Sequence, residues 1–275
     1  MKNSIEILVS FMEAANIKKI SELETFDFKK IYTCSKLKGF DNNKGYEDGD
    51  CTKLAYAIDW IIWGRELQNE NLLASEEDLF NEKNFSGDTI CTFNTLFGST
   101  PDFQCSVISM LRKYIPLIKE EMEKFRNIYQ TIGNFSLLPN KSINGQTLNK
   151  YRGRYWGWKD YFDIFLKELD KALNNESENS FFCDIVNENK FFFNKCNSVE
   201  KYCKLFYLDS NFSFKGNVHF NHNMLKDKNA EEYGNFVIDY IEKSERLIKK
   251  RASLLCKELI KILSKENDFP KNYLN

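Results

Sequence analysis

Histidine is scarce in this chain of 275 residues, which has only His219 and His222. A Ser-His-Asp or Cys-His catalytic device would have to use this one segment, VHFNHN. No HExxH, Walker or GxGxxG pattern is present, which disfavours standard zinc-protease, ATP and NAD chemistry. An excess of one charge is also lacking, because 39 Lys and Arg residues nearly balance 40 Asp and Glu residues. No global field draws the chain to nucleic acid or membranes, so a polyanion site must be a local patch.

Apolar runs are too short for a membrane span. The longest, from Ala55 to Trp63, is interrupted by Asp59 and falls short of the roughly 18 residues that a spanning helix needs. No signal-peptide layout is present, and the eight cysteines are scattered without a CxxC pair. These features predict a cytoplasmic protein with reduced thiols. The spacing of Cys196 and Cys203 from the two histidines does not match structural zinc sites, so we expect no metal and no other cofactor.

Helical periodicity dominates what is present. Apolar residues recur at helical spacing in residues 4–20, 53–67, 105–129, 158–173 and 231–265. Pro116 should kink or split the third of these helices. The last one runs for roughly nine turns and either spans the domain or projects as an arm. We therefore predict a mainly α-helical single domain over residues 1–275, with 231–265 as a long C-terminal helix.

The stretch from Thr131 to Asp163 separates two of these helices and has turn chemistry of its own. Connections between helices usually have about 2–8 residues, so a longer one is usually functional or a small sheet. Asn144-Gly145, flanked by NFSLLP and QTLNKY, is a common type I′ hairpin signal. This pattern predicts a small β-ribbon insertion near residues 134–150.

Residues 151–159, YRGRYWGWK, alternate basic and aromatic side chains. Arginine makes bidentate phosphate contacts and rings provide stacking platforms, so the segment could hold a nucleotide or a single strand. In the alternative interpretation, the rings belong to the core and the arginines cap the preceding turn. The first interpretation predicts a ligand site formed by Asn149, Arg152, Arg154, Trp156, Asp160 and Asp163.

Two of these residues, Asp160 and Asp163, lie near the start of a predicted helix. Their spacing of three puts both carboxylates on one side, where a general acid and base or a metal could use them. Carboxylates at this position more commonly interact with the helix dipole. Both interpretations are kept.

Motifs in the same region are TIG at 131–133, NKSINGQTLN at 140–149 and RG at 152–153. They resemble an uncharacterised family of bacterial cytosolic proteins that is known only as a domain of unknown function. The similarity covers about residues 105–225 and fits the N-terminal third poorly. Asn134 stands where that family usually has a second glycine. IGNFSLL at 132–138 is also similar to the tail of HNH-type restriction nucleases, without their metal motif, which implies a bacterial defence context.

These patterns leave three functions open, and they do not decide whether the chain is an enzyme. The first is an intracellular binding module for a phosphate-bearing ligand, RNA or nucleotide, in a defence or mobile-element context. The second is a protein-interaction or inhibitor module that uses the aromatic surface and the C-terminal helix, whose half beyond Arg251 would face a partner or a second copy. The third is an atypical or degenerate nuclease that uses Asp160, Asp163 and His219.

Overall fold

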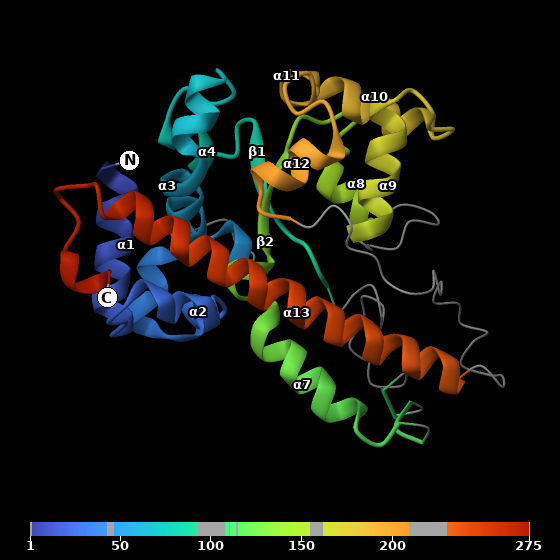
Figure 1. Ribbon diagram of the computed structural model, residues 1–275, viewed down its shortest axis with the longest axis horizontal. Helices are drawn as coiled ribbons and strands as arrows, with labels where there is room; N and C mark the ends of the chain where they lie inside the picture. The colour runs from blue at the N-terminus through green and yellow to red at the C-terminus, as the bar shows by residue number, and fades with distance from the viewer. Residues whose placement is uncertain are drawn as a thin grey trace.

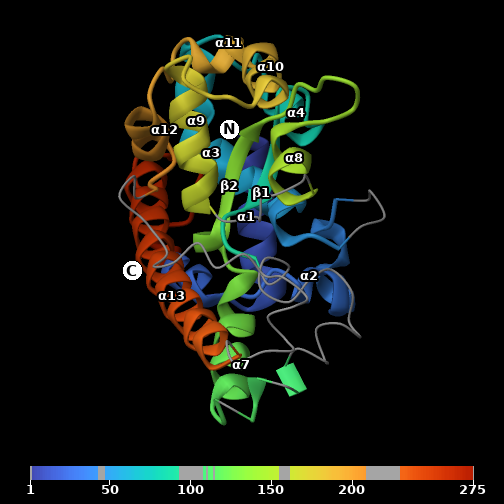
Figure 2. The ribbon, with the colours of Figure 1, turned by 90° about the vertical axis from the view of Figure 1, so that its right-hand side faces the viewer.

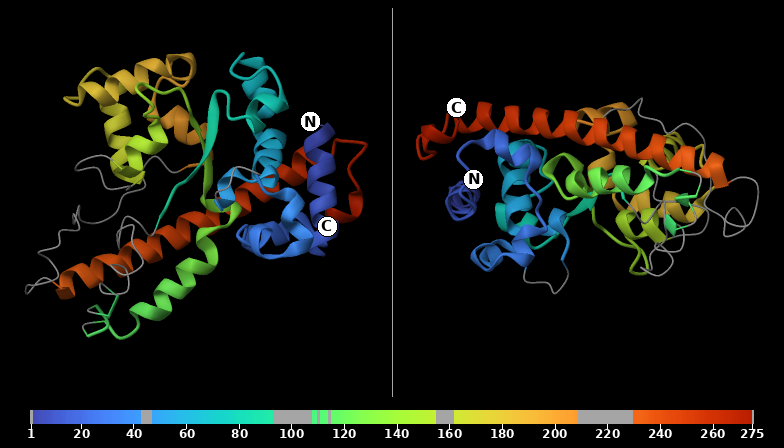
Figure 3. Two further views of the ribbon diagram at one scale, coloured as in Figure 1. Left: turned by 180° about the vertical axis from the view of Figure 1, so that it is seen from behind. Right: turned by 90° about the horizontal axis from the view of Figure 1, so that it is seen from below.

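The protein is mainly α-helical, with a small two-stranded sheet among the described residues, as predicted (Figure 1). The computed structural model describes residues 2–42, 47–92, 108–109, 111–113, 115–154, 162–208 and 230–274. Its two ends lie at the same end of the molecule, where the first helix, α1 (Lys2–Ala15), is close to η6 (Lys271–Tyr273) (Figure 3). No helix within these ranges is long and apolar enough to cross a membrane.

Helix α13 (Ala230–Leu263) runs through the whole molecule and confirms the predicted long C-terminal helix (Figure 1). Helix α7 (Ile118–Tyr129) packs beside its N-terminal half and begins just after Pro116, where a split was predicted. The turn η1 (Ile20–Thr25) and helix α3 (Lys53–Asn69) also pack against α13.

The C-terminal half of α13 is covered by the protein itself. Leu255, Leu259 and Leu263 are fully buried, whereas Leu254 is 39% exposed. The expectation that this half faces a partner or a second copy is therefore wrong for most of the stripe, because η1 and α3 already remove it from water. Only the edge around Leu254 stays accessible.

Helix α3 is buried on nearly every side, as its dense apolar sequence predicted. Thr52 begins it, since its Oγ1 accepts a hydrogen bond from the N–H of Ala55 (3.1 Å). Helix α1 packs against it. The segments that connect α1 to α3 include α2 (Lys30–Thr33), η2 (Ser35–Phe40) and η3 (Gly49–Cys51).

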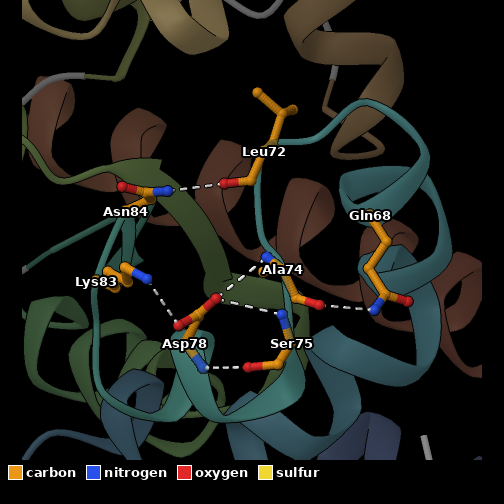
Figure 4. Close-up of polar contacts among 7 residues, drawn as sticks. All are labelled: Gln68, Leu72, Ala74, Ser75, Asp78, Lys83 and Asn84. Carbon is orange, nitrogen blue, oxygen red and sulfur yellow. Dashed lines mark hydrogen bonds and ion pairs between the residues drawn. The ribbon is translucent and has the colours of Figure 1, made fainter.

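Helix α4 (Glu76–Phe80) connects α3 to the sheet, and hydrogen bonds cap the start of this helix. Ser75 Oγ accepts from the N–H of Asp78, and Asp78 Oδ2 accepts from the N–H of Ser75, both at 3.2 Å (Figure 4). This capping box satisfies backbone donors at the start of the helix. Asn84 Nδ2 also donates to Leu72 O (2.8 Å), and this bond joins the residue before β1 to the segment after α3.

The sheet pairs β1 (Phe85–Thr89) with β2 (Phe135–Pro139) in antiparallel register, Gly87 opposite Leu137. Strand β2 lies where the ribbon was predicted, but its expected partner after the Asn144-Gly145 turn is wrong. That turn exists, with positive φ at both residues, and closes a single bridge between Ile143 and Gln146. Helix α8 (Leu148–Arg154) follows at once, so no second hairpin strand forms.

A group of short helices forms the end of the molecule beside the sheet (Figure 2). Their bounds are α9 (Phe162–Leu173), α10 (Ser180–Glu188), α11 (Lys190–Phe193) and α12 (Val199–Leu205). Aromatic rings pack them together, because Tyr202 on α12 contacts Phe165 on α9 and Phe192 on α11, each at 6.3 Å between ring centres. Trp63 Nε1 on α3 donates to Leu205 O (2.9 Å), which joins α12 to the rest of the core.

Candidate functional site

The TIGN segment, residues 131–134, is buried and serves the fold. Asn134 Nδ2 donates to Tyr129 O (2.8 Å) and Cys91 O (2.9 Å), and Asn134 Oδ1 accepts from the N–H of Cys91 (2.9 Å). One side chain thus satisfies three backbone groups at the end of the ribbon. Both amide hydrogens are used inside the protein, so Asn134 has no donor left for a ligand.

Gly133, in η4 (Ile132–Asn134), lies directly against α13. A Cβ atom at this position would be 2.1 Å from Ile248 O, so only glycine permits the contact. Arg251, buried on α13, donates from Nη1 to Ile132 O (3.3 Å) and Gly133 O (3.0 Å). Its Nε donates to Phe206 O (2.9 Å), so one guanidinium connects α13, η4 and the end of α12.

The six residues predicted to bind the ligand differ in how much of each one the structure describes. Asn149 Nδ2 donates to Gly87 O (3.2 Å) and fastens α8 to β1. Arg152 and Arg154 follow on the same helix. The side chains of Arg152 and Arg154 lie outside the described residues. Trp156 and Asp160 lie outside them entirely. Since four of the six residues are not fully described, the binding role of this set stays a prediction.

Tyr151, from the same basic and aromatic segment, belongs to the core. Its ring stacks on Phe182 at 5.6 Å between centres and 29° between planes, and its hydroxyl accepts from Asn179 Nδ2 (2.6 Å). For this ring, the alternative interpretation is the right one.

Asp163 lies in the first turn of α9, and only 2% of it is exposed. Its Oδ1 accepts a hydrogen bond from the N–H of Ile164 (3.0 Å). A buried carboxylate in the first turn of a helix interacts favourably with the helix dipole. This position favours the structural interpretation of Asp163.

Among the described residues, no three His, Cys, Asp or Glu side chains are placed to hold a metal ion. His219 and His222 lie outside these residues. The described cysteines are free thiols. Cys105 is not among them because it too lies outside the described residues.

A groove between α12 and α13 offers a different site. It encloses about 290 Å³ and is lined from the end of α12 by Lys204 and Tyr207, and from α13 by Leu247, Lys250, Arg251 and Leu254. The four α13 residues are spaced at i, i+3, i+4 and i+7, so they share one face of that helix. We call this the α12–α13 groove.

The charged side chains among the described lining residues of the α12–α13 groove are all positive. Lys204 and Lys250 are exposed, Arg251 is buried, and no carboxylate is among the described lining residues. Burial raises the pKa of Tyr207, and Glu258 and Glu66 raise it further. Glu258 is itself paired with Lys261 (2.9 Å). The groove therefore presents a local positive patch on a protein with almost no net charge.

The buried guanidinium of Arg251 and the buried carboxyl of Asp59 act on each other. Burial lowers the pKa of Arg251 to about 10, although Asp59 opposes this, so Arg251 stays protonated at neutral pH. Burial raises the pKa of Asp59, and the charge of Arg251 opposes this rise. Nη2 of Arg251 has no hydrogen-bond partner among the described residues. The carbonyls that Nε and Nη1 bind hold the guanidinium rigidly beneath the groove.

A second cavity, of about 410 Å³, lies between α1, α3 and α4 and has a different character. Burial strongly raises the pKa of the Cys51 thiol and of the Tyr56 hydroxyl, and the latter donates to Glu82 Oε1 (2.6 Å). Both groups are neutral at physiological pH, so Cys51 lacks the thiolate that a nucleophile needs. Apart from Lys53, this cavity offers neutral groups and does not complement an anion.

The α12–α13 groove was missed in the sequence, although one signal was present. Arg251 falls between Ile248 and Leu255 on the buried face of the helix, where a charged residue is rare unless it is paired or hydrogen-bonded. Three basic residues, Lys249, Lys250 and Arg251, are consecutive in the sequence. Only Lys249 and Lys250 are exposed.

Comparison with known protein families places the chain in a family. A model described as a family of unknown function (DUF6994) matches residues 26–255, which includes much of the N-terminal third that was expected to fit poorly. No curated protein and no solved structure matches the chain. The resemblance to the tail of HNH-type nucleases finds no support in these comparisons.

Proposed function

The chain belongs to this family of unknown function, as its motifs predicted, and since the family assigns no activity we propose from the groove itself that the protein binds a small phosphate-bearing ligand. The α12–α13 groove is the binding site in this proposal. Lys204 and Lys250 contact the phosphate, and Arg251 supplies a fixed positive charge beneath it.

The observation that carries the proposal is the convergence of three cationic side chains without a lining carboxylate among the described residues. Lysine binds phosphate as a mobile point charge, whereas the buried arginine cannot move away from the groove. A partly enclosed site also screens these charges less than open water does. An anion is therefore the ligand class that the groove complements best.

Groove size favours a small molecule over RNA. A cavity of about 290 Å³ is near the lower end of small-molecule sites, which span roughly 300–1,000 Å³. RNA-binding surfaces instead follow the backbone with an extended basic stripe, and this chain has a net charge of −1. We therefore narrow the phosphate-bearing ligand to a molecule of about the size of a mononucleotide.

Titration calorimetry with inorganic phosphate and with four nucleoside monophosphates tests this proposal. Lys204→Gln and Lys250→Gln should each weaken phosphate binding about tenfold, because each removes a charge-assisted contact. The matched controls are Lys201→Gln on α12, whose Nζ bonds Asn197 Oδ1 (2.8 Å), and Lys249→Gln on α13, which is paired with Glu245. Both controls should bind like the parent protein.

The proposal fails if none of these phosphates binds, or if the control substitutions weaken binding as much as the groove substitutions. Binding that grows with the length of an oligonucleotide would favour an extended RNA surface over this groove. A binding loss confined to Arg152→Ala would return the site to the segment that the sequence first indicated.

A further inference from the structure

Tyr207 has a backbone conformation that side chains of its kind seldom adopt. Six non-glycine residues in the described part of the chain have positive φ, and four of them are asparagines, which tolerate this region. The exceptions are Glu82 and Tyr207, with φ of 54° and 55°. Tyr207 lines the α12–α13 groove.

The reason for the conformation is the way in which α12 ends. The N–H of Leu208 donates back to Cys203 O (2.7 Å), and Tyr207 occupies the left-handed position within this closing turn. Glycine is the usual residue there because it has no Cβ to clash. A tyrosine costs free energy at this position, so its side chain needs a compensating role.

Groove geometry places this residue in one hollow with the two lysines and Leu254. Tyr207 lies three residues after Lys204, and Leu254 lies four residues after Lys250, which is about one helical turn on each side of the groove. The groove is therefore lined by two basic side chains, an aromatic residue and an exposed leucine.

We infer that Tyr207 is a stacking platform and that the ligand of the groove is a nucleoside phosphate. The base lies against Tyr207 and Leu254, and the phosphate lies between Lys204 and Lys250. Leu254, one of the few large apolar side chains exposed among the described residues, supplies the apolar wall. This inference rests on the proposed phosphate-binding function and names the class of ligand.

The test compares AMP, GMP, CMP and UMP with ribose 5-phosphate, which carries the phosphate without a base. The parent protein should bind at least one nucleotide about tenfold more tightly than ribose 5-phosphate, because stacking on an aromatic ring strengthens binding by about this factor. Tyr207→Leu and Tyr207→Gly should abolish that preference and leave the affinity for ribose 5-phosphate unchanged. Tyr207→Phe should keep it.

Two outcomes overturn the inference while the proposed function stands. In the first, the parent binds ribose 5-phosphate as tightly as every nucleotide. In the second, Tyr207→Leu lowers the melting temperature and leaves the preference intact, which would show that the ring only packs against Trp63, 6.4 Å away between ring centres. If no phosphate binds the parent protein at all, the proposed function and this inference both fail. The glycine variant keeps the test valid, because glycine fits the left-handed turn without strain.

Discussion

Arg251 on α13 donates a hydrogen bond from Nη1 to the carbonyl oxygen of Gly133, 3.0 Å away. The two residues are far apart in sequence, and this bond joins the long C-terminal helix to the TIGN segment. The same guanidinium also binds the carbonyl oxygens of Phe135 and Phe206. Since a buried carbonyl without a donor is costly, Arg251 stabilises several segments at once.

Replacing Arg251 with glutamine should therefore destabilise the fold strongly. Arg251→Gln removes the donors of several buried carbonyls, and we expect a loss of about 3 kcal/mol or more in the free energy of unfolding by urea. Arg246→Gln, on an exposed position of the same helix, is the control and should change it by less than about 0.5 kcal/mol. Equal effects of the two substitutions would contradict the structural role of Arg251.

The hydrogen bonds of Asn134 should be needed in the same way. Asn134→Leu keeps a similar volume but removes three hydrogen bonds to the backbone of Cys91 and Tyr129, so a loss of about 2–4 kcal/mol is expected. Asn174→Leu, at an exposed position near the end of α9, should be nearly neutral. Chemical denaturation measures both. A tolerated Asn134→Leu would mean that the side chain does not hold the ribbon to η4.

Stability should depend on pH through Asp59. Burial raises the pKa of this carboxyl from 3.8 to about 8, so between these values the folded protein holds one more proton than the unfolded chain. The contribution of protonated Asp59 to the free energy of unfolding is therefore full below about pH 4 and is lost as the pH rises through about 8. Asp59→Asn, which stays neutral, should flatten the fall in stability and unfold less easily at about pH 8 than the parent.

Urea unfolding of both proteins at about pH 5 and pH 8 checks this prediction. Asp50, whose pKa is raised to about 7 by burial, adds a dependence of the same sign in both proteins, so the difference between the two profiles reports Asp59 together with its coupling to Asp50. Identical pH profiles for parent and variant would show that Asp59 is ionised in the folded protein.

The leucines of α13 should divide into core and surface positions. Leu255→Glu places a carboxylate where only 1% of the side chain is exposed, and should lower the free energy of unfolding by about 3 kcal/mol or more. The neighbouring Leu254→Glu should remain folded. Light scattering measures the oligomeric state of each variant, and thermal unfolding measures its stability. A folded Leu255→Glu monomer derived from a larger parent assembly would restore the partner-facing interpretation of this half of the helix.

The helices of this fold could be predicted because their apolar residues repeat every turn. The stripe of α13 and the break at Pro116 are signals of this kind, each contained in one segment. The ribbon could be predicted only in part. Asn144-Gly145 does form the turn that its residues favour, but β2 pairs with β1, nearly fifty residues earlier. A local turn signal contains no information about such a distant partner.

The site was less predictable still, because the α12–α13 groove exists only where two distant helices meet. Lys204 on α12 and Lys250 on α13 share no sequence pattern. The left-handed conformation at position 207 could not be predicted, because the residue there is a tyrosine and not a glycine or asparagine. Arg251 is an exception, because helical periodicity alone places this residue on the buried face of α13. A charged residue at a core position indicates a hydrogen-bond network that the sequence cannot specify.

Hydrogen–deuterium exchange, measured with and without saturating nucleoside monophosphate, tests the central claim most directly, because it locates the bound ligand on the chain. Binding in the α12–α13 groove predicts slower exchange in residues 203–208 and 247–254, and unchanged exchange in α8, residues 148–154. At the same nucleotide concentration, the Lys250→Gln variant should show less of this protection, and Lys249→Gln should retain all of it. Protection of α8 with no change in α12 and α13 would contradict the groove and would place the phosphate site at Asn149, Arg152 and Arg154 instead.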